Sequence, residues 1–213
     1  EGCNFDMRKQ LLEDDNVAND QRTIIYRQRN ELMASDDISE LLKEMREEVV
    51  AQVVDDYIPP QSVPEQWDVA GLEESIKTEF NTSQPIQQWL DEDDQLYEDQ
   101  LKAKLTDILE KEYENKAEAV GENMRLFEKQ ITLQILDGLW KDHLATMDHL
   151  RQGIFLRSYG GKNPRQEYKR EAFALFTELL DHLQREAIKV LSHVKIRQED
   201  PADAIERKRR EEA

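Results

Sequence analysis

The side chains that most often carry chemistry are present in this 213-residue sequence, but their spacing does not favour catalysis. His143 and His149 are six residues apart, so they lie on different faces of a helix and do not form an i, i+4 metal pair. Cys3 is the only cysteine, which excludes an intramolecular disulfide and a cysteine-based zinc cage. The sequence contains no G-x-x-x-x-G-K-[ST] phosphate loop, G-x-S-x-G elbow or H-E-x-x-H pair. We therefore expect this chain alone to be no enzyme and to hold no cofactor or metal.

A second group of side chains is basic and is suited to binding an acidic partner. The whole chain carries a formal net charge of −18, yet residues 151–170 contain six basic residues and a single acid, Glu167. Such a segment can dock on an acidic protein surface, or on anionic lipid, where each basic residue contributes about 1 kcal/mol. On charge alone, the pattern favours the simpler alternative, a solvated helix face of mixed charge. The six candidate docking residues are Arg151, Arg157, Lys162, Arg165, Lys169 and Arg170.

Tyr159 lies within this basic segment, at a predicted reversal of the chain. The neighbouring Gly160 and Gly161 give the backbone the freedom to turn. Asn163 and Pro164 then fit the N-cap and the first position of a helix. Ser158, Tyr159 and Gly160 are therefore candidate contact residues at the tip of a turn, although an aromatic there can also pack back on its own helices.

The elements that must position this turn are two long helices with facing apolar stripes. Residues at three-to-four spacing on both sides predict an antiparallel helical hairpin. We expect the first helix to end at Gly153 and the second to run from Pro164 to Val194, about 45 Å. The stripes are Leu133, Leu136, Trp140, Leu144, Met147 and Leu150, then Ala172, Phe176, Leu179, Leu183, Ala187, Val190 and Val194.

The composition predicts an all-α chain throughout. Charged residues make up 36%, and only seven glycines and six prolines are available for turns, which favours long, partly solvated helices over a sheet. We expect a first helix in residues 1–34, a small helical domain in 35–120, the hairpin in 121–199 and a charged tail in 200–213. The first two divisions rest on the capping-box spacing of Asp37 and Glu40 and on Gly121, and Pro59-Pro60 is expected to stop a helix inside the small domain.

The bulky side chains of the small domain are expected to form a satellite core of Trp67, Phe80 and Trp89. No apolar region of a signal peptide is visible in the first ten residues, and no run of about 20 apolar residues is present, so a soluble chain is expected. The chain begins without Met inside a helical pattern, which suggests part of a longer protein.

The residues alone leave two classes of function open, and a family resemblance adds a third. A helical adaptor that binds a protein partner ranks first. Nucleic-acid binding through the basic segment is disfavoured by the acidic average, and because stacking platforms interleave several aromatics whereas only Tyr159 lies near the turn. The third class, a moving part of a larger machine, rests on a family resemblance.

Ordered stretches along nearly the whole chain resemble the SecA preprotein translocase ATPase. NFDMRKQLLE (4–13) and VANDQR (17–22) are similar to its scaffold helix, and YIPP (57–60) with WD (67–68) to its wing. The hairpin is similar to its two-helix finger through LWKDHL (139–144), MD (147–148), LRQGI (150–154), LRSY (156–159) and NPRQEYKRE (163–171). One departure is EDDN (13–16), where Asp14 replaces the family's usual aromatic.

This resemblance implies part of an ATP-driven motor that moves unfolded preproteins through the SecYEG channel. Its fold would be a long scaffold helix (1–34, truncated at its start), a helical wing (35–120) and an antiparallel finger (121–199). Tyr159, with Ser158 and Gly160, would touch the moving polypeptide. The protein would be cytoplasmic and peripherally attached to the cytoplasmic face of the bacterial plasma membrane.

The resemblance also implies regulation and partners. The segment that would restrain ATPase activity contains Asp148, Leu150, Gly153, Ile154 and Leu156. The expected partners are SecYEG, unfolded preprotein, the motor's own nucleotide-binding domains, anionic lipids and a second copy of the chain, with no nucleic acid. ATP with magnesium, and the zinc of the family's C-terminal tail, would bind outside this chain.

Overall fold

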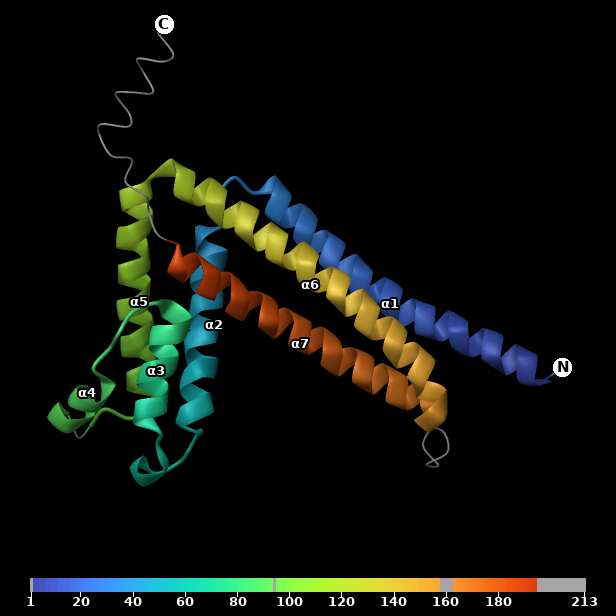
Figure 1. Cartoon of the computed structure of the whole chain (residues 1–213), viewed down its shortest axis with the longest axis horizontal. Coiled ribbons are helices and arrows are strands. Elements are labelled where there is room, and N and C mark those ends of the chain that lie inside the picture. Colours follow the sequence, from blue (N-terminus) through green and yellow to red (C-terminus); the bar gives the residue numbers. More distant parts are fainter. Residues whose placement is uncertain (1, 94, 158–162, 195–213) are drawn as a thin grey trace, which may run out of the picture.

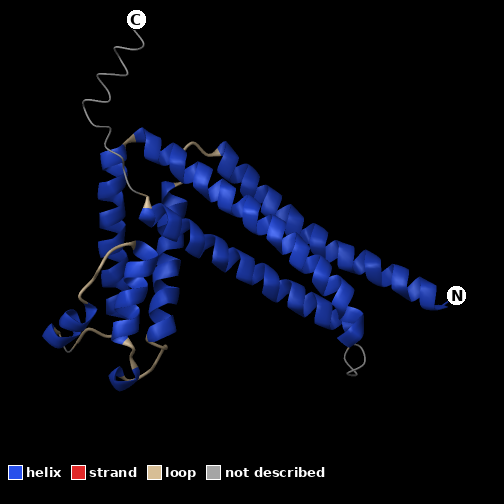
Figure 2. Cartoon of the chain, in the orientation of Figure 1, coloured by secondary structure: helices blue, strands red, loops and turns tan. Residues whose placement is uncertain are grey.

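Helices joined by short turns make up the residues that the structure, a computed structural model, describes: 2–93, 95–157 and 163–194. Seven α-helices and one 3₁₀ turn account for this part of the chain, and no strand occurs within it (Figure 2). The all-α prediction is therefore confirmed.

Three long helices lie side by side: α1 (Gly2–Ala34), α6 (Glu122–Arg157) and α7 (Pro164–His193) (Figure 1). α6 and α7 run antiparallel and make the most extensive helix pair, and α1 packs against both. The N-terminal part of α1 extends past the end of this pair (Figure 1). The predicted hairpin is thus present, and the first helix contacts it through part of its length.

Four shorter helices gather at the opposite end: α2 (Ser39–Tyr57), α3 (Val69–Phe80), α4 (Ile86–Glu92) and α5 (Glu98–Val120). A 3₁₀ turn, Pro64–Gln66, lies between α2 and α3. We call α2 to α5 the wing bundle. α2 packs against α3, α5 and α7, and α3 also reaches α7, so the bundle is seated on the second helix of the hairpin.

Local chemistry explains the ends of these helices. α2 ends at Tyr57, and after the C-cap residue Ile58 come Pro59 and Pro60, the predicted helix stop. Asp68 caps α3, because its Oδ1 accepts a hydrogen bond from the Gly71 N–H at 2.9 Å. Gly121 separates α5 from α6 with φ 75°, ψ −151°, a conformation that only glycine adopts readily.

Three sequence predictions need correction. Asp37 and Glu40 form no capping box; the Asp37 carboxylate instead accepts from the Ser39 N–H, two residues on, at 2.7 Å. α6 continues past Gly153 to Arg157, since one glycine weakens a helix without ending it. At the end of α7 the apolar stripe moves to Ile188 and Leu191, while Val190 and Val194 are only half-buried.

The core is also less divided than predicted. Phe80 is buried, and Trp67 and Trp89 pack at the edge of one apolar cluster that runs from the wing bundle into α6 and α7. The three residues therefore do not form a satellite core. A second, smaller cluster lies toward the α6–α7 turn and contains Met147, Leu150, Ile154, Tyr168 and Ala172. The domain boundaries at residues 34, 120 and 199 remain predictions.

Candidate functional site

The hairpin formed by α6 and α7 is held closed by apolar side chains along its length. Toward the wing bundle these include Leu136, Trp140 and Phe176, and toward the turn they are the five residues of the smaller cluster. Ile154 and Tyr168 are almost completely buried there. Full burial of one such side chain is worth about 1.5–3 kcal/mol, so the far end of the hairpin is packed rather than frayed.

A buried polar contact fastens α1 to both helices of the hairpin. Gln21 of α1 donates from Nε2 to the backbone oxygen of Ala172 in α7 at 2.9 Å. Its Oε1 lies 2.8 Å from His143 Nε2 in α6. An amide oxygen only accepts, so His143 donates and carries its proton on Nε2. Burial lowers the pKa of His143, which favours the neutral ring.

The residues predicted to regulate an ATPase separate into two kinds. Leu150 and Ile154 are buried in the smaller cluster, whereas Asp148 is exposed and pairs with Arg151 at 3.3 Å. Gly153 has open space where a Cβ would stand. Leu156 belongs to α6, but its side chain lies outside the described part. The segment thus combines an inward apolar face with an outward polar one.

The predicted fingertip and part of the predicted docking set lie outside the described residues. These are Ser158, Tyr159, Gly160 and Lys162, together with the side chain of Arg157. The turn is nevertheless bracketed by described helices. Asn163 caps α7 as predicted, because its Oδ1 accepts from the Arg165 N–H at 3.0 Å.

The described basic residues are unequal in exposure and in pairing. Arg165 is half-buried, and Lys169 and Arg170 are exposed. Arg170 binds Glu167 at 2.6 Å, so part of the local positive charge is compensated within α7. A docking surface built on this segment would therefore be weaker than the residue count alone predicts.

Phe173 is a candidate contact residue that the sequence analysis missed. Its side chain is 71% exposed, and it lies three and four residues after Arg170 and Lys169, on the same face of α7. A phenylalanine outside the apolar stripe of a strongly amphipathic helix was the signal available in the sequence. The face combines an apolar ring with cationic side chains.

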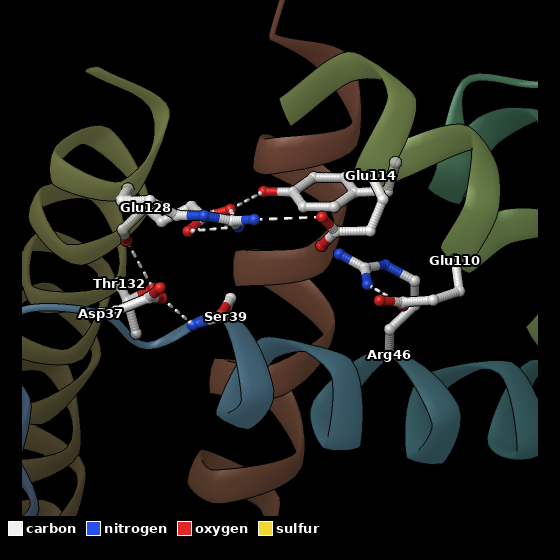
Figure 3. A network of polar contacts seen from close by, with 9 residues as sticks. Asp37, Ser39, Arg46, Glu110, Glu114, Glu128 and Thr132 are labelled. Carbon is white, nitrogen blue, oxygen red and sulfur yellow. Dashed lines mark hydrogen bonds and ion pairs between the residues drawn. The ribbon is translucent and has the colours of Figure 1, made fainter. Parts of the chain in front are cut away.

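A buried polar network joins α5 to α6 where the wing bundle meets the hairpin (Figure 3). The Glu128 carboxylate is fully buried and accepts hydrogen bonds from the Tyr113 hydroxyl and from Arg125 Nη1, both at 2.8 Å. Arg125 Nη2 also donates to Glu114 at 3.0 Å. Burial, and then the charge of Glu128, raise the pKa of Tyr113, so its hydroxyl stays protonated and donates.

Arg46 extends this network to α2 (Figure 3). Its side chain is only 2% exposed, pairs with Glu110 of α5 and lies 3.9 Å above the centre of the Tyr113 ring. The sequence analysis missed all of these residues, because charged residues that pair 64 positions apart look like ordinary surface residues in a sequence. The network links α2, α5 and α6 through charge-assisted bonds.

Two lysines hold the C-terminal ends of the long helices. Lys116 Nζ of α5 donates to the backbone oxygens of Leu191 and Ser192 at 3.0 and 2.9 Å. Lys129 Nζ of α6 donates to those of Met33 and Ser35 at 2.6 and 2.8 Å. Ammonium groups suit these positions, because the last carbonyls of a helix lack partners within it and carry partial negative charge. Burial lowers the pKa of Lys116.

The described residues meet neither the requirements of a metal site nor those of a membrane span. Within the described part, no three His, Cys, Asp or Glu side chains gather closely enough to hold a metal ion. Among the described residues, no helix combines the length and the apolar character needed to cross a bilayer.

Comparison with known proteins places these features in a family. Residues 1–195 match the family model of the SecA wing and scaffold domain. The chain is 58% identical over 212 residues to the protein translocase subunits SecA of Ectopseudomonas mendocina (strain ymp) and Pseudomonas fluorescens (strain Pf0-1). It is 57% identical to that of Pseudomonas putida (strain F1). Each match covers 99% of this chain but only 23% of the relative.

Proposed function

The chain belongs to the SecA wing and scaffold family, and from that premise we propose that it supplies the scaffold, wing and finger of an ATP-driven preprotein translocase. The chain spans about a quarter of the length of its curated relatives, so nucleotide and magnesium would bind in other parts of such a motor. On this proposal the motor is cytoplasmic, attaches peripherally to the membrane and acts on unfolded preproteins at the SecYEG channel.

The observation that carries the proposal is the α6–α7 hairpin. It projects away from the wing bundle, is packed to its far end and is braced by α1 (Figure 1). α6 has 36 residues and α7 has 30, which correspond to about 54 and 45 Å. Packed helices of this length shift as bodies rather than bend, so the hairpin suits transmission of a displacement from one end to the other.

The tip of the hairpin would be the contact with polypeptide. Tyr159 offers apolar area without demanding a particular partner sequence, which suits a motor with varied substrates. Phe173, Lys169 and Arg170 form a second outward face along α7 that suits the channel mouth or anionic lipid. On this proposal, the tip of the hairpin contacts the moving preprotein. The outward face of α7 contacts the channel mouth or the lipid, which does not move with the preprotein.

The scaffold would also restrain ATP turnover in the free motor. The support is that Leu150 and Ile154 lock the far end of the hairpin, while Asp148 faces outward, where a nucleotide-binding domain can reach it. Ile154→Ala removes packing worth about 2–5 kcal/mol from a buried site. In the intact motor it is expected to raise basal ATP turnover in the absence of channel, whereas Ala174→Ser, at an exposed site on α7, is the matched control.

The decisive experiment places a single cysteine at the tip. In the intact translocase, Cys3→Ser and replacement of any other cysteine provide the background, and Tyr159→Cys provides the probe. Translocation is stalled with a folded domain at the end of the preprotein, and crosslinks are then formed. Adducts to both the channel and the preprotein are expected, whereas Thr177→Cys, exposed farther along α7, is expected to capture no preprotein.

The opposite result has a clear meaning. If position 159 captures neither partner while ATP turnover and transport stay normal, the hairpin is only a support. The chain would then be a helical adaptor, and its family role would lie in holding other domains together.

A further inference from the structure

A cavity of about 770 Å³ lies where the wing bundle meets the three long helices. Its wall takes residues from α1, from the connection between α1 and α2, and from α2, α6 and α7. Three of these residues, Asp37, Ser39 and Thr132, are labelled in Figure 3. The volume falls in the range of ordinary small-molecule sites. Nothing in the proposed translocation role uses this cavity.

Leucine side chains give the cavity its apolar wall. Leu41 is 41% exposed and Leu180 is half-buried, so both can contact a molecule that enters. Leu32, Leu136 and Leu183 also line the cavity and are buried in the core. An apolar body bound here would cover Leu41, one of the large apolar side chains that the fold leaves in contact with solvent, and this burial favours binding.

The charged side chains of the wall are all acidic. Glu31, Asp37 and Glu40 are exposed, and no lysine, arginine or histidine lines the cavity among the described residues. Within that part of the chain, neither Glu31 nor Glu40 forms an ion pair. Hydrogen bonding from Ser39 lowers the pKa of Asp37, which keeps its carboxylate ionised.

Lys129 of α6 is a cation of the same region, and it leaves these carboxylates uncompensated. Its ammonium group donates to the backbone oxygens of Met33 and Ser35, so it is tied to the backbone rather than to an acid. The acidic wall therefore attracts cations and repels anions. A simple metal cation would gain nothing from the leucines, whereas an organic cation can use both parts of the wall.

We propose that this cavity binds a small amphiphilic amine, with its apolar body against Leu41 and Leu180 and its ammonium group at the acidic wall of Glu31, Asp37 and Glu40. The bound amine contacts residues of the wing bundle and of the long helices together. It would therefore hold the two parts of the fold against each other.

The first test compares three naphthalene probes that differ in charge, 2-(1-naphthyl)ethylamine, 2-(1-naphthyl)ethanol and 1-naphthylacetate. Binding to the full chain is followed by the NMR shifts of its leucine methyl groups. The amine is expected to bind with a Kd of about 1 mM or lower, as is usual for ligands of this size. It is expected to bind at least about threefold more tightly than the alcohol and at least about tenfold more tightly than the carboxylate.

Variants of the acidic wall test the role of its charge. Glu31→Gln/Glu40→Gln is expected to weaken binding of the amine by about fivefold or more and to change binding of the alcohol by less than about twofold. Glu118→Gln/Glu178→Gln makes the same charge change at exposed sites of α5 and α7 outside the cavity, and is expected to leave the amine within about twofold. The proposal is overturned if the amine binds no more tightly than the carboxylate, or if both double variants have the same effect.

A second test locates the bound amine. In a Cys3→Ser background, Ser39→Cys places a thiol in the cavity wall, and Ser83→Cys places one at an exposed site outside it. Saturating 2-(1-naphthyl)ethylamine is expected to slow alkylation by iodoacetamide, an uncharged reagent, at least about fivefold at position 39 and to leave the rate at position 83 unaltered. Equal effects at the two positions mean that the amine binds elsewhere, and the proposal fails.

The same alkylation assay separates the amine from a second copy of the chain as the occupant. If protection at position 39 rises with chain concentration and does not respond to the amine, a second copy covers the cavity and the proposal is overturned. Neither test depends on translocation, so the proposed function and this inference can fail separately.

Discussion

Replacing Arg125 with methionine is expected to destabilise the chain, because it leaves the buried carboxylate of Glu128 without its cation. Breaking a buried ion pair costs about 3–5 kcal/mol when one charge is stranded. Here the Tyr113 hydroxyl still donates to Glu128, and 29% of the Arg125 side chain already meets water, which reduces the loss. We therefore expect the free energy of unfolding to fall by about 2–3 kcal/mol.

The assay is urea unfolding of the chain followed by far-ultraviolet circular dichroism at neutral pH. Lys111→Met is the matched control on the neighbouring helix, because Lys111 forms an exposed pair with Asp107 and its loss is expected to cost less than about 0.5 kcal/mol. Methionine is unbranched and uncharged and suits a helix, and it shortens both side chains, so the comparison of the two variants reports mainly on the ion pairs.

A double variant gives the sharper result. Glu128→Gln/Arg125→Met removes the stranded charge and keeps an amide oxygen for the Tyr113 hydroxyl, so it is expected to recover at least about 1 kcal/mol relative to Arg125→Met alone. The reasoning is refuted if Arg125→Met matches the Lys111 control, or if the double variant is no more stable than the single one.

Three further predictions concern other parts of the fold. Because burial lowers the pKa of His143, the unfolded chain takes up a proton that the folded chain resists; the unfolding free energy is expected to fall as pH drops below 6.5, and this part of the slope is expected to vanish in His143→Gln. Gly121→Ala is expected to cost about 1–3 kcal/mol in urea unfolding through backbone strain alone, since no atom beyond its chain neighbours lies within 4 Å of the added Cβ; a neutral result would contradict the φ of 75°. Phe173→Ser is expected to leave the unfolding free energy within about 0.5 kcal/mol and to weaken any self-association seen by sedimentation; a strictly monomeric parent chain would remove that second expectation.

The sequence was most informative where the deciding interactions are local. The hairpin followed from residues three and four apart, the cap at Asn163 from one side chain and its near neighbours, and the break at Gly121 from the scarcity of glycine. Such features depend on the helical repeat, which a sequence displays directly. The end of the first finger helix was placed too early, because Gly153 lowers helix propensity but packing of Ile154 outweighs it.

The buried polar contacts could not be read in the same way. Gln21 meets Ala172 across 151 positions, and Arg46 meets Glu110 across 64. Before the fold is known, each of these side chains resembles the many solvated polar residues of an acidic helical protein. The exposed Phe173 was visible in the sequence but gains meaning only once the buried stripe of α7 is fixed. The tip residues, inferred from the turn pattern and given their role by the resemblance, stay predictions.

The unbroken run of α6 from Glu122 to Arg157 limits how the length of this gene segment can change over evolution. One residue inserted inside α6 would rotate everything beyond it by about 100° and advance it by about 1.5 Å, which would turn the apolar seam away from α7. Deletions would do the same in reverse. Length variation among related sequences should therefore collect between residues 58 and 68 or 81 and 85, where short turns separate the helices, and should avoid α6, whereas single-residue exchanges on its outer face should be common.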